Sequence, residues 1–194
     1  MTKGTDELES KLEGGIETQT FDVKDSCAWN VDSIVKDILA MSNVQDGGYI
    51  LIGVEDGTFA RHGISAAHKA TYDLDIMKDQ MAPYADPHTN FALEFPRDHT
   101  GLEYAVIRVF PFEEQPVICR KNGKEVHAGV LYYRNRAGRV QSAAVSNAHD
   151  MREIITNATV KMMQSVREKG FSVAPQVREE ELVQKIMAKE RNGL

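Results

Sequence analysis

The chain of 194 residues has little that would place it in a membrane, a disulfide scaffold or the zinc proteins. No apolar run approaches the roughly 20 residues that a membrane-spanning helix needs. The two cysteines, Cys27 and Cys119, lie far apart without metal-ligand spacing, which favours reduced thiols. No two of the six histidines have the i, i+3 or i+4 spacing of a zinc-binding helix. The polar residues 1–7 predict that no signal peptide is present, so we expect a cytoplasmic protein with no membrane partner.

The sequence also lacks several motifs of enzymes that act on nucleotides or esters. It contains no Gly-x4-Gly-Lys-Ser/Thr phosphate-binding loop and no Gly-x-Gly-x-x-Gly fingerprint after a strand. We therefore expect no nucleotide cofactor. The Gly-x-Ser-x-Gly nucleophile elbow of hydrolases is missing as well.

Charge is placed unevenly along the chain, whose formal net charge is -6. Residues 1–94 carry 7 Lys and Arg against 17 Asp and Glu, whereas residues 95–194 carry 16 against 12. Between positions 120 and 140 there is one acid, Glu125, and six bases: Arg120, Lys121, Lys124, Arg134, Arg136 and Arg139. The local field, and not the total charge, decides whether a polyanion can dock. The alternative is a solvated hairpin whose bases balance the acidic half of the chain.

Composition and hydrophobic periodicity predict a globular α+β fold with a mixed or antiparallel sheet packed against helices. Hydrophobic residues make up 42% of the chain and charged residues 27%, which are globular values. Apolar residues recur at i, i+3, i+4, i+7 and i+8 over residues 31–39, as in a helix packed on a core. Gly47-Gly48 then predicts a tight turn into a buried strand over residues 49–54.

The remaining elements follow from turns and periodicity. We predict a short strand at 21–23, a loop at 57–70 and a helix at 71–82. Strands at 89–95 and 104–110 form a hairpin, and strands at 117–119 and 130–133 form a second one around Asn122-Gly123. A helix over 147–169 carries one apolar face: Met151, Ile154, Ile155, Ala158 and Met162.

The predicted organisation is a polar tail (1–13), a domain (14–169), a linker (170–177) and a C-terminal amphipathic helix (178–194). Leu182, Val183, Ile186 and Met187 form the apolar face of that last helix. This face can fold back on its own domain or dock on another subunit. Homodimer formation and a role as a protein-interaction module are therefore open alternatives.

Several segments resemble, in their order, the Schlafen-like AlbA-type nucleic-acid-binding domains, once labelled divergent AAA. Residues 17–24 resemble the opening motif, in which a Glu is followed five residues later by Glu-Phe-Lys. The helix ending at residues 40–43, the Gly-Gly turn and residues 53–56 resemble the family's Ala-x-Ala-Asn, Gly-Gly and Gly-Val-x-Asp. Residues 115–117 and 131–134 resemble its later segments. The resemblance covers about residues 13–155 and implies binding of RNA or DNA.

The resemblance also implies a candidate catalytic site. Some Schlafen-like domains are metal-dependent ribonucleases with an acidic triad at positions matching Glu17, Asp22 and Asp56, and Lys24 lies beside it. The triad would hold Mg²⁺ or Mn²⁺, since these ions favour oxygen ligands. Asp22 stands where the family usually has the longer Glu. The alternatives are that these acids are structural, or that Glu55 replaces Asp56 as a ligand, because the two point to opposite faces of a strand.

A second candidate site combines aromatic residues and arginines, a combination typical of contacts with phosphates and stacked bases. We predict phosphate contacts from Arg134, Arg136 and Arg139 and from Arg120, Lys121 and Lys124, with Tyr133 beside them. The family usually has Gly-Ser-Ser-Thr after the arginine, where this chain has Asn-Arg-Ala-Gly-Arg. The predicted function is nucleic-acid binding, with metal-dependent cleavage as the alternative.

Overall fold

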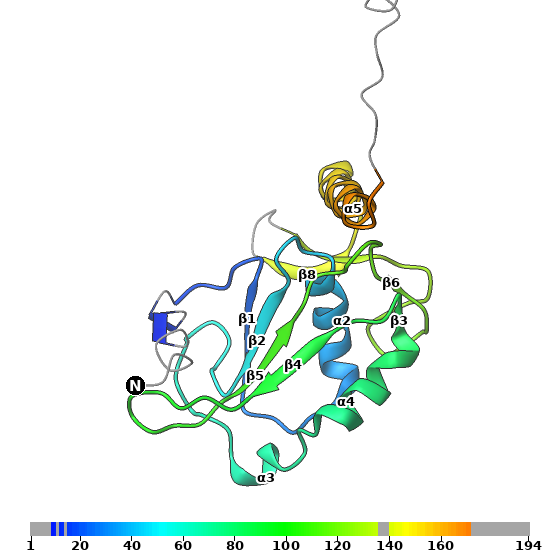
Figure 1. The fold of residues 1–194 in the computed structure, drawn as a ribbon. Coiled ribbons are helices and arrows are strands. Elements are labelled where there is room, and N and C mark those ends of the chain that lie inside the picture. The colour runs from blue at the N-terminus through cyan, green and yellow to red at the C-terminus, as the bar shows by residue number, and fades with distance from the viewer. Residues whose placement is uncertain (1–8, 11, 14, 136–139, 172–194) are drawn as a thin grey trace, which may run out of the picture. The chain divides into compact units, whose positions relative to one another are not determined.

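A computed structural model describes residues 9–10, 12–13, 15–135 and 140–171. Its centre is a four-stranded sheet in the order β1-β2-β5-β4, formed by β1 (Phe21–Lys24), β2 (Gly48–Ile52), β5 (Ala105–Val109) and β4 (Phe91–Glu94). Strand β1 runs parallel to β2, and the other neighbours are antiparallel (Figure 1). The mixed sheet and its helices confirm the predicted α+β class, including the hairpin of β4 and β5.

Helices α2 (Val31–Ser42) and α4 (Leu74–Met81) supply the main core on one face of the sheet. The apolar stripe of α2 is buried against Ile50, Ile52 and Ile107 of the sheet. Helix α2 begins where the Asn30 side chain accepts a hydrogen bond from the amide of Asp32. Helix α4 begins later than predicted because Asp73 caps it, and a short helix, α3 (Ala66–Lys69), lies within the predicted loop.

The double glycine before β2 is required by both backbone conformation and space. Gly47 has φ +72°, and a Cβ there would lie 2.2 Å from the carbonyl oxygen of Val109. A Cβ on Gly48 would lie 2.7 Å from the sulfur of Met41. The turn therefore brings β2 against both β5 and the end of α2 more closely than any side chain would permit.

The other face of the sheet carries a smaller core to which the N-terminal segment contributes. Leu12, inside the predicted polar tail, is buried with Phe21, Leu51 and Tyr104. Glu9 also contacts the domain, through Arg61 at 2.9 Å. The described part of this segment thus packs on the sheet.

The second predicted hairpin forms only in part. Strand β6 (Ile118–Cys119) pairs with β3 (Ala85–Asp86), which follows the 3-10 helix η1 (Ala82–Tyr84), and β7 (Tyr132–Asn135) pairs with β8 (Gln141–Ala144). The two predicted partners meet in an antiparallel bridge of Ile118 and Leu131, and the amide of Cys119 donates to the carbonyl of Val130 at 2.9 Å. The buried side chain of Asn43 also connects these two segments, because its amide donates to the carbonyls of Val117 (2.8 Å) and Tyr132 (2.9 Å).

The chain divides into two compact units, Met1–Lys161 and Met162–Leu194, and helix α5 (Ala148–Glu168) runs across the division. Ile154 of α5 is buried, but Met151 and Ile155 are 39% and 55% exposed, so the predicted apolar face is not buried as a whole. Among the described residues, no helix combines the length and apolarity needed to cross a bilayer. The predicted C-terminal helix and the linker from residue 172 lie outside the described residues.

Candidate functional site

A cleft of about 330 Å³, referred to below as the acidic cleft, brings together the acids that the family resemblance singled out. Strand β1, helix α2, the segment after β2 and the β7–β8 pair all contribute to it. Its charged lining residues are Glu17, Asp22, Lys24, Lys36, Asp37, Asp56, Glu125 and Arg134. Acids outnumber bases among these residues, so the cleft by itself is a poor site for a phosphate group.

Strand pairing places two of these residues on the helix side of the sheet. Asp22 lies opposite Ile50 and Lys24 opposite Ile52, and both isoleucines belong to the main core. Because side chains alternate along a strand, Asp22 and Lys24 therefore face α2. The charged side chains of Asp22 and Lys24 therefore lie in largely buried positions, where each charge needs a partner of opposite sign.

Arg134 supplies one of those partners from β7. Its Nη1 donates to Oδ1 of Asp22 at 2.7 Å, and its Nη2 donates to the carbonyls of Thr18 (3.1 Å) and Phe21 (3.2 Å). Arg134 is 1% exposed and Asp22 is 6% exposed. Contrary to the prediction of a surface phosphate contact, the guanidinium is buried and holds β7 against β1, because β7 packs into the domain along most of its length.

Lys24 extends this pairing to helix α2. Its Nζ lies 2.7 Å from Oδ2 of Asp37 and 3.3 Å from Oδ2 of Asp22. Burial alone would lower the pKa of Lys24, but the charges of Asp37 and Asp22 outweigh it, so the pKa stands well above its ordinary value. Asp37 is not among the site residues predicted from the sequence. Its position three residues after Ile34, on the apolar stripe of the helix, could have indicated it, because an acid that is buried there needs a cation as a partner.

Glu17 lines the same cleft, and the carboxylates of Asp22 and Asp56 lie near it. Burial, followed by the nearby Asp22 and Asp56 carboxylates, raises the pKa of Glu17 above its ordinary value. The amide of Val23 donates to its Oε1 at 3.5 Å. Glu55 does not line the cleft, and its carboxylate accepts a hydrogen bond from the Thr58 hydroxyl instead.

The carboxylates as arranged do not fit the Mg²⁺ or Mn²⁺ site that the resemblance implied. Within the described ranges, no group of three His, Cys, Asp or Glu side chains is placed to hold a metal ion. Asp22 is in contact with two cations of the protein, Arg134 and Lys24. An ion that demands octahedral oxygen ligands would have to compete with both.

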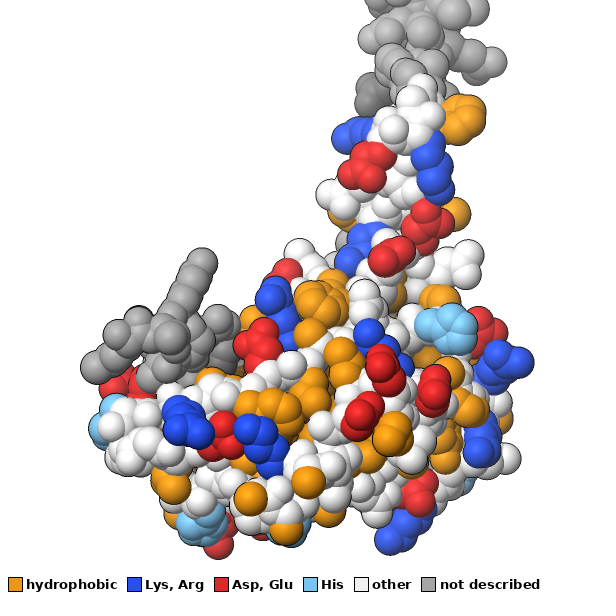
Figure 2. All heavy atoms as spheres, turned by 60° about the horizontal axis from the view of Figure 1, so that its bottom comes forward, with side chains coloured by type: hydrophobic (Ala, Val, Ile, Leu, Met, Phe, Trp, Pro, Cys, Tyr) orange, Lys and Arg blue, Asp and Glu red, His pale blue; other side chains and the backbone are white. Residues whose placement is uncertain are grey.

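Three exposed bases lie together on a turn beside the acidic cleft. This basic turn, residues 120–124, presents Arg120, Lys121 and Lys124 to solvent. The Lys121 ammonium lies 5.1 Å from the ring centre of Tyr84, and Glu125, which lines the acidic cleft, pairs with Lys36 at 2.6 Å. On the face shown in Figure 2, bases and acids are interspersed, and no broad field of one sign is visible there.

The other predicted nucleic-acid contacts have different outcomes. Tyr133 is 1% exposed and packs with Val44 and Ile154, so its ring is not available for a base to stack on. Arg136 and Arg139 lie outside the described residues. Val140, which follows Arg139 in the chain, lines the acidic cleft.

The chain was compared with protein-family profiles, with curated proteins and with solved structures. The profile of the family described as "Schlafen, AlbA_2" matches residues 17–143. No curated protein matches the chain. Among solved structures, the DIP2311 protein from Corynebacterium diphtheriae is similar with a TM-score of 0.49 and 18% sequence identity. The match covers 75% of this chain and 27% of that protein.

Proposed function

Because this chain belongs to the Schlafen AlbA_2 family, we propose that it binds nucleic acid, RNA or DNA, through the basic turn and the rim of the acidic cleft. Family membership supports a role connected with nucleic acid. One observation favours binding over cleavage: the Asp22 carboxylate at the centre of the cleft is occupied by Arg134 and Lys24. In this proposal, those charges hold the fold together and the exposed bases meet the phosphates.

The charge on the basic turn has the properties that phosphate contacts require. Arg120, Lys121 and Lys124 are exposed, and the neighbouring acid, Glu125, is paired with Lys36. Exposed ammonium and guanidinium groups attract a polyanion at a distance and release its counterions on contact. Binding of this kind is insensitive to sequence and weakens steeply with salt.

The test is the salt dependence of binding, measured by fluorescence anisotropy with labelled single-stranded RNA, single-stranded DNA and duplexes. The variant Arg120→Ala/Lys121→Ala/Lys124→Ala should bind more weakly, and the slope of log K against log salt should fall by roughly 3, about one for each lost contact. The control Lys69→Ala/Lys78→Ala/Arg97→Ala removes as many charges elsewhere and should keep the wild-type slope. Equal losses in both variants would contradict a localised site.

Metal-dependent cleavage is the second candidate, and one observation favours it. Glu17, Asp22 and Asp56 line the same cleft, and burial together with the charges of Asp22 and Asp56 raises the pKa of Glu17. Incubation of labelled RNA with Mn²⁺ or with EDTA tests this candidate. Products that need Mn²⁺ and disappear in Asp56→Asn would establish a nuclease, whereas intact RNA that still binds would support binding alone.

A further inference from the structure

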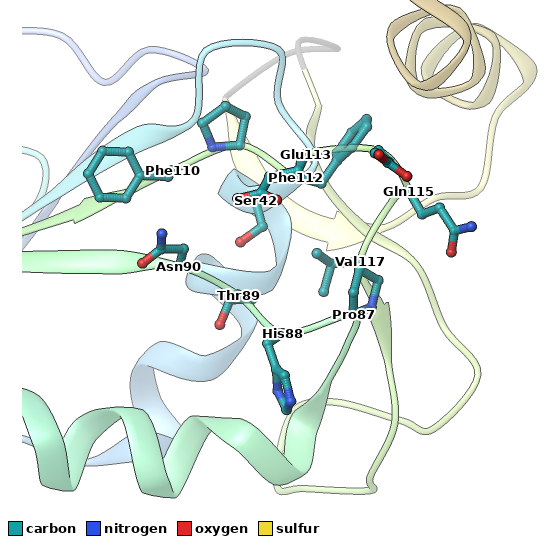
Figure 3. Close-up of a pocket in the computed structure, with 12 residues that line it drawn as sticks. Ser42, Pro87, His88, Thr89, Asn90, Phe110, Phe112, Glu113, Gln115 and Val117 are labelled. Carbon is teal, nitrogen blue, oxygen red and sulfur yellow. The ribbon is translucent and has the colours of Figure 1, made fainter. Parts of the chain in front are cut away.

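A second hollow of about 360 Å³ shares no lining residue with the acidic cleft. We call it the Asn90 pocket. It lies where β5 ends and β4 begins, between segments 87–90 and 110–115, with the end of α2 behind it (Figure 3). Figure 3 shows Ser42 between these segments and Asn90 at the start of β4, while the imidazole of His88 extends away from the middle of the group. The size is that of a site for a small molecule or for one unit of a polymer.

The lining of the Asn90 pocket combines flat apolar surfaces with uncharged polar groups. Phe110, Pro111 and Phe112 form one wall, and Pro87 and Val117 contribute to the other. Hydroxyl and amide groups come from Ser42, Thr89, Asn90 and Gln115. The side chain of Asn90 is exposed at the rim of the pocket, and its amide makes no hydrogen bond with any other described residue, so its donor and acceptor are available to a ligand.

A cation stands beside the aromatic wall. Arg108 lies on the sheet face away from α2, opposite Tyr49 on β2 and Ala92 on β4. Its guanidinium carbon is 5.0 Å from the ring centre of Phe110 and 5.7 Å from that of Tyr49. These contacts hold an exposed side chain in place, and no carboxylate of the described residues pairs with its guanidinium.

The charges around the pocket give a ligand a direction. Two exposed acids, Glu113 and Glu114, line the end of the pocket formed by residues 113–115, whereas Arg108 lies outside the lining, beside Phe110. Lys161 lies near that end, but its ammonium donates to the Phe112 carbonyl at 2.7 Å. A phosphate is therefore favoured beside Arg108, whereas an amino group of a base finds acceptors in the amide and carboxylate oxygens.

We propose that the Asn90 pocket receives the base of an unpaired nucleotide, whose phosphate is held by Arg108. The Asn90 amide recognises the edge of the base, and Phe110 provides an aromatic surface for it. Bases in a duplex are stacked and cannot enter such a pocket, so the nucleic acid that binds is single-stranded at this point. The inference rests on the proposed function and specifies its substrate class.

The experiment compares single-stranded RNA with a duplex of the same sequence, bound by the wild-type chain, Asn90→Ala and Arg108→Ala. Wild type should prefer the single strand. Asn90→Ala should weaken single-strand binding roughly five- to tenfold, the loss expected for hydrogen bonds to a base edge, and leave duplex binding unchanged. Gln164→Ala and Arg97→Ala remove an exposed amide and an exposed base elsewhere and should match wild type.

A second measurement locates the ligand without a polymer. In ¹H–¹⁵N NMR spectra, AMP, GMP, CMP and UMP should shift the side-chain amide signals of Asn90 and the backbone signals of residues 110–112. The inference is overturned if single-strand binding depends on the basic turn but is unchanged in Asn90→Ala and Arg108→Ala, an outcome that leaves the proposed function standing. It is also overturned if an arginine-rich peptide, and no nucleotide, produces the shifts. Failure of wild type to bind any nucleic acid would reject the proposed function and the inference with it.

Discussion

The acidic cleft and the basic turn use the same kinds of side chain in opposite ways. In the cleft, Arg134 and Lys24 are largely enclosed and lie within 3.3 Å of carboxylate oxygens. On the basic turn, Arg120, Lys121 and Lys124 face solvent. The two regions are neighbours, because Glu125 belongs to the lining of the cleft and follows Lys124 directly in the chain.

The difference shows that burial, and not residue type, decides what a basic side chain can do here. A buried cation loses its hydration and needs a carboxylate beside it, so it becomes part of the fold. An exposed cation keeps its hydration and can exchange it for a phosphate. If burial decides the role of a charge, substitutions in the cleft should lower the free energy of unfolding more than substitutions on the basic turn.

Arg134→Met should lower the free energy of unfolding by roughly 3–5 kcal/mol, because Asp22 would remain buried without its main partner. Urea denaturation followed by circular dichroism measures the change. The double variant Asp22→Asn/Arg134→Met is the control and should recover much of the loss, since it leaves no unpaired buried charge behind, Lys24 keeping Asp37 as its partner. A loss below about 1 kcal/mol in the single variant would show that the pair is not a structural element.

Asn43→Ala should cost roughly 2–4 kcal/mol, because buried carbonyls and an amide would lose their partners. Asn43 connects the segment before the basic turn to β7, through Val117 and Tyr132, and so joins the two regions. Asn122→Ala provides the matched control, since the Asn122 side chain accepts one exposed hydrogen bond from the amide of Ala128. Similar losses in the two variants would mean that Asn43 does not hold these segments together.

Glu17→Gln should raise stability slightly at pH 7, by less than about 1 kcal/mol because solvent screens the site. The carboxyl has a raised pKa in the folded chain, so the folded state carries a cost once the pH exceeds the ordinary value of 4.5. Acidification protonates Glu17 in both states and removes this cost. The difference between variant and wild type should therefore shrink from pH 7 to pH 4 in urea titrations. A difference that grows on acidification would contradict the raised pKa.

Arg120→Ala/Lys121→Ala/Lys124→Ala should leave the free energy of unfolding within about 0.5 kcal/mol of wild type, since the three side chains are exposed. The same protein should bind nucleic acid more weakly, so stability and binding separate at the basic turn. A large loss of stability would show that these bases support the fold, as Arg134 does.

Local patterns predicted the elements that depend on neighbouring residues in the chain. The stripe of residues 31–39 corresponds to α2, the double glycine to the turn before β2, and the 89–110 segment to the β4–β5 hairpin. The resemblance to the Schlafen AlbA-type family is confirmed by the match over residues 17–143. Each of these features has a signal within a short stretch of sequence, namely periodicity, turn chemistry or motif order.

Features that depend on distant partners escaped prediction. The basic run of residues 120–139 gave no indication that Arg134 is buried, because its partner Asp22 lies far away in the chain. The partner of β6 is β3, which comes from before the central hairpin. The Asn90 pocket combines α2, the start of β4 and the end of β5, and no motif marks it.

The sequence by itself therefore determined the family, the fold class and the candidate acids around Glu17, Asp22 and Asp56. Only the tertiary structure decided which charged side chains stabilise the fold and which face solvent. The physical reason is that the cost of burying a charge depends on what surrounds it in three dimensions. Arg134 and Lys121 look alike in the sequence, and packing of β7 against β1 makes the first a structural residue while the second remains exposed.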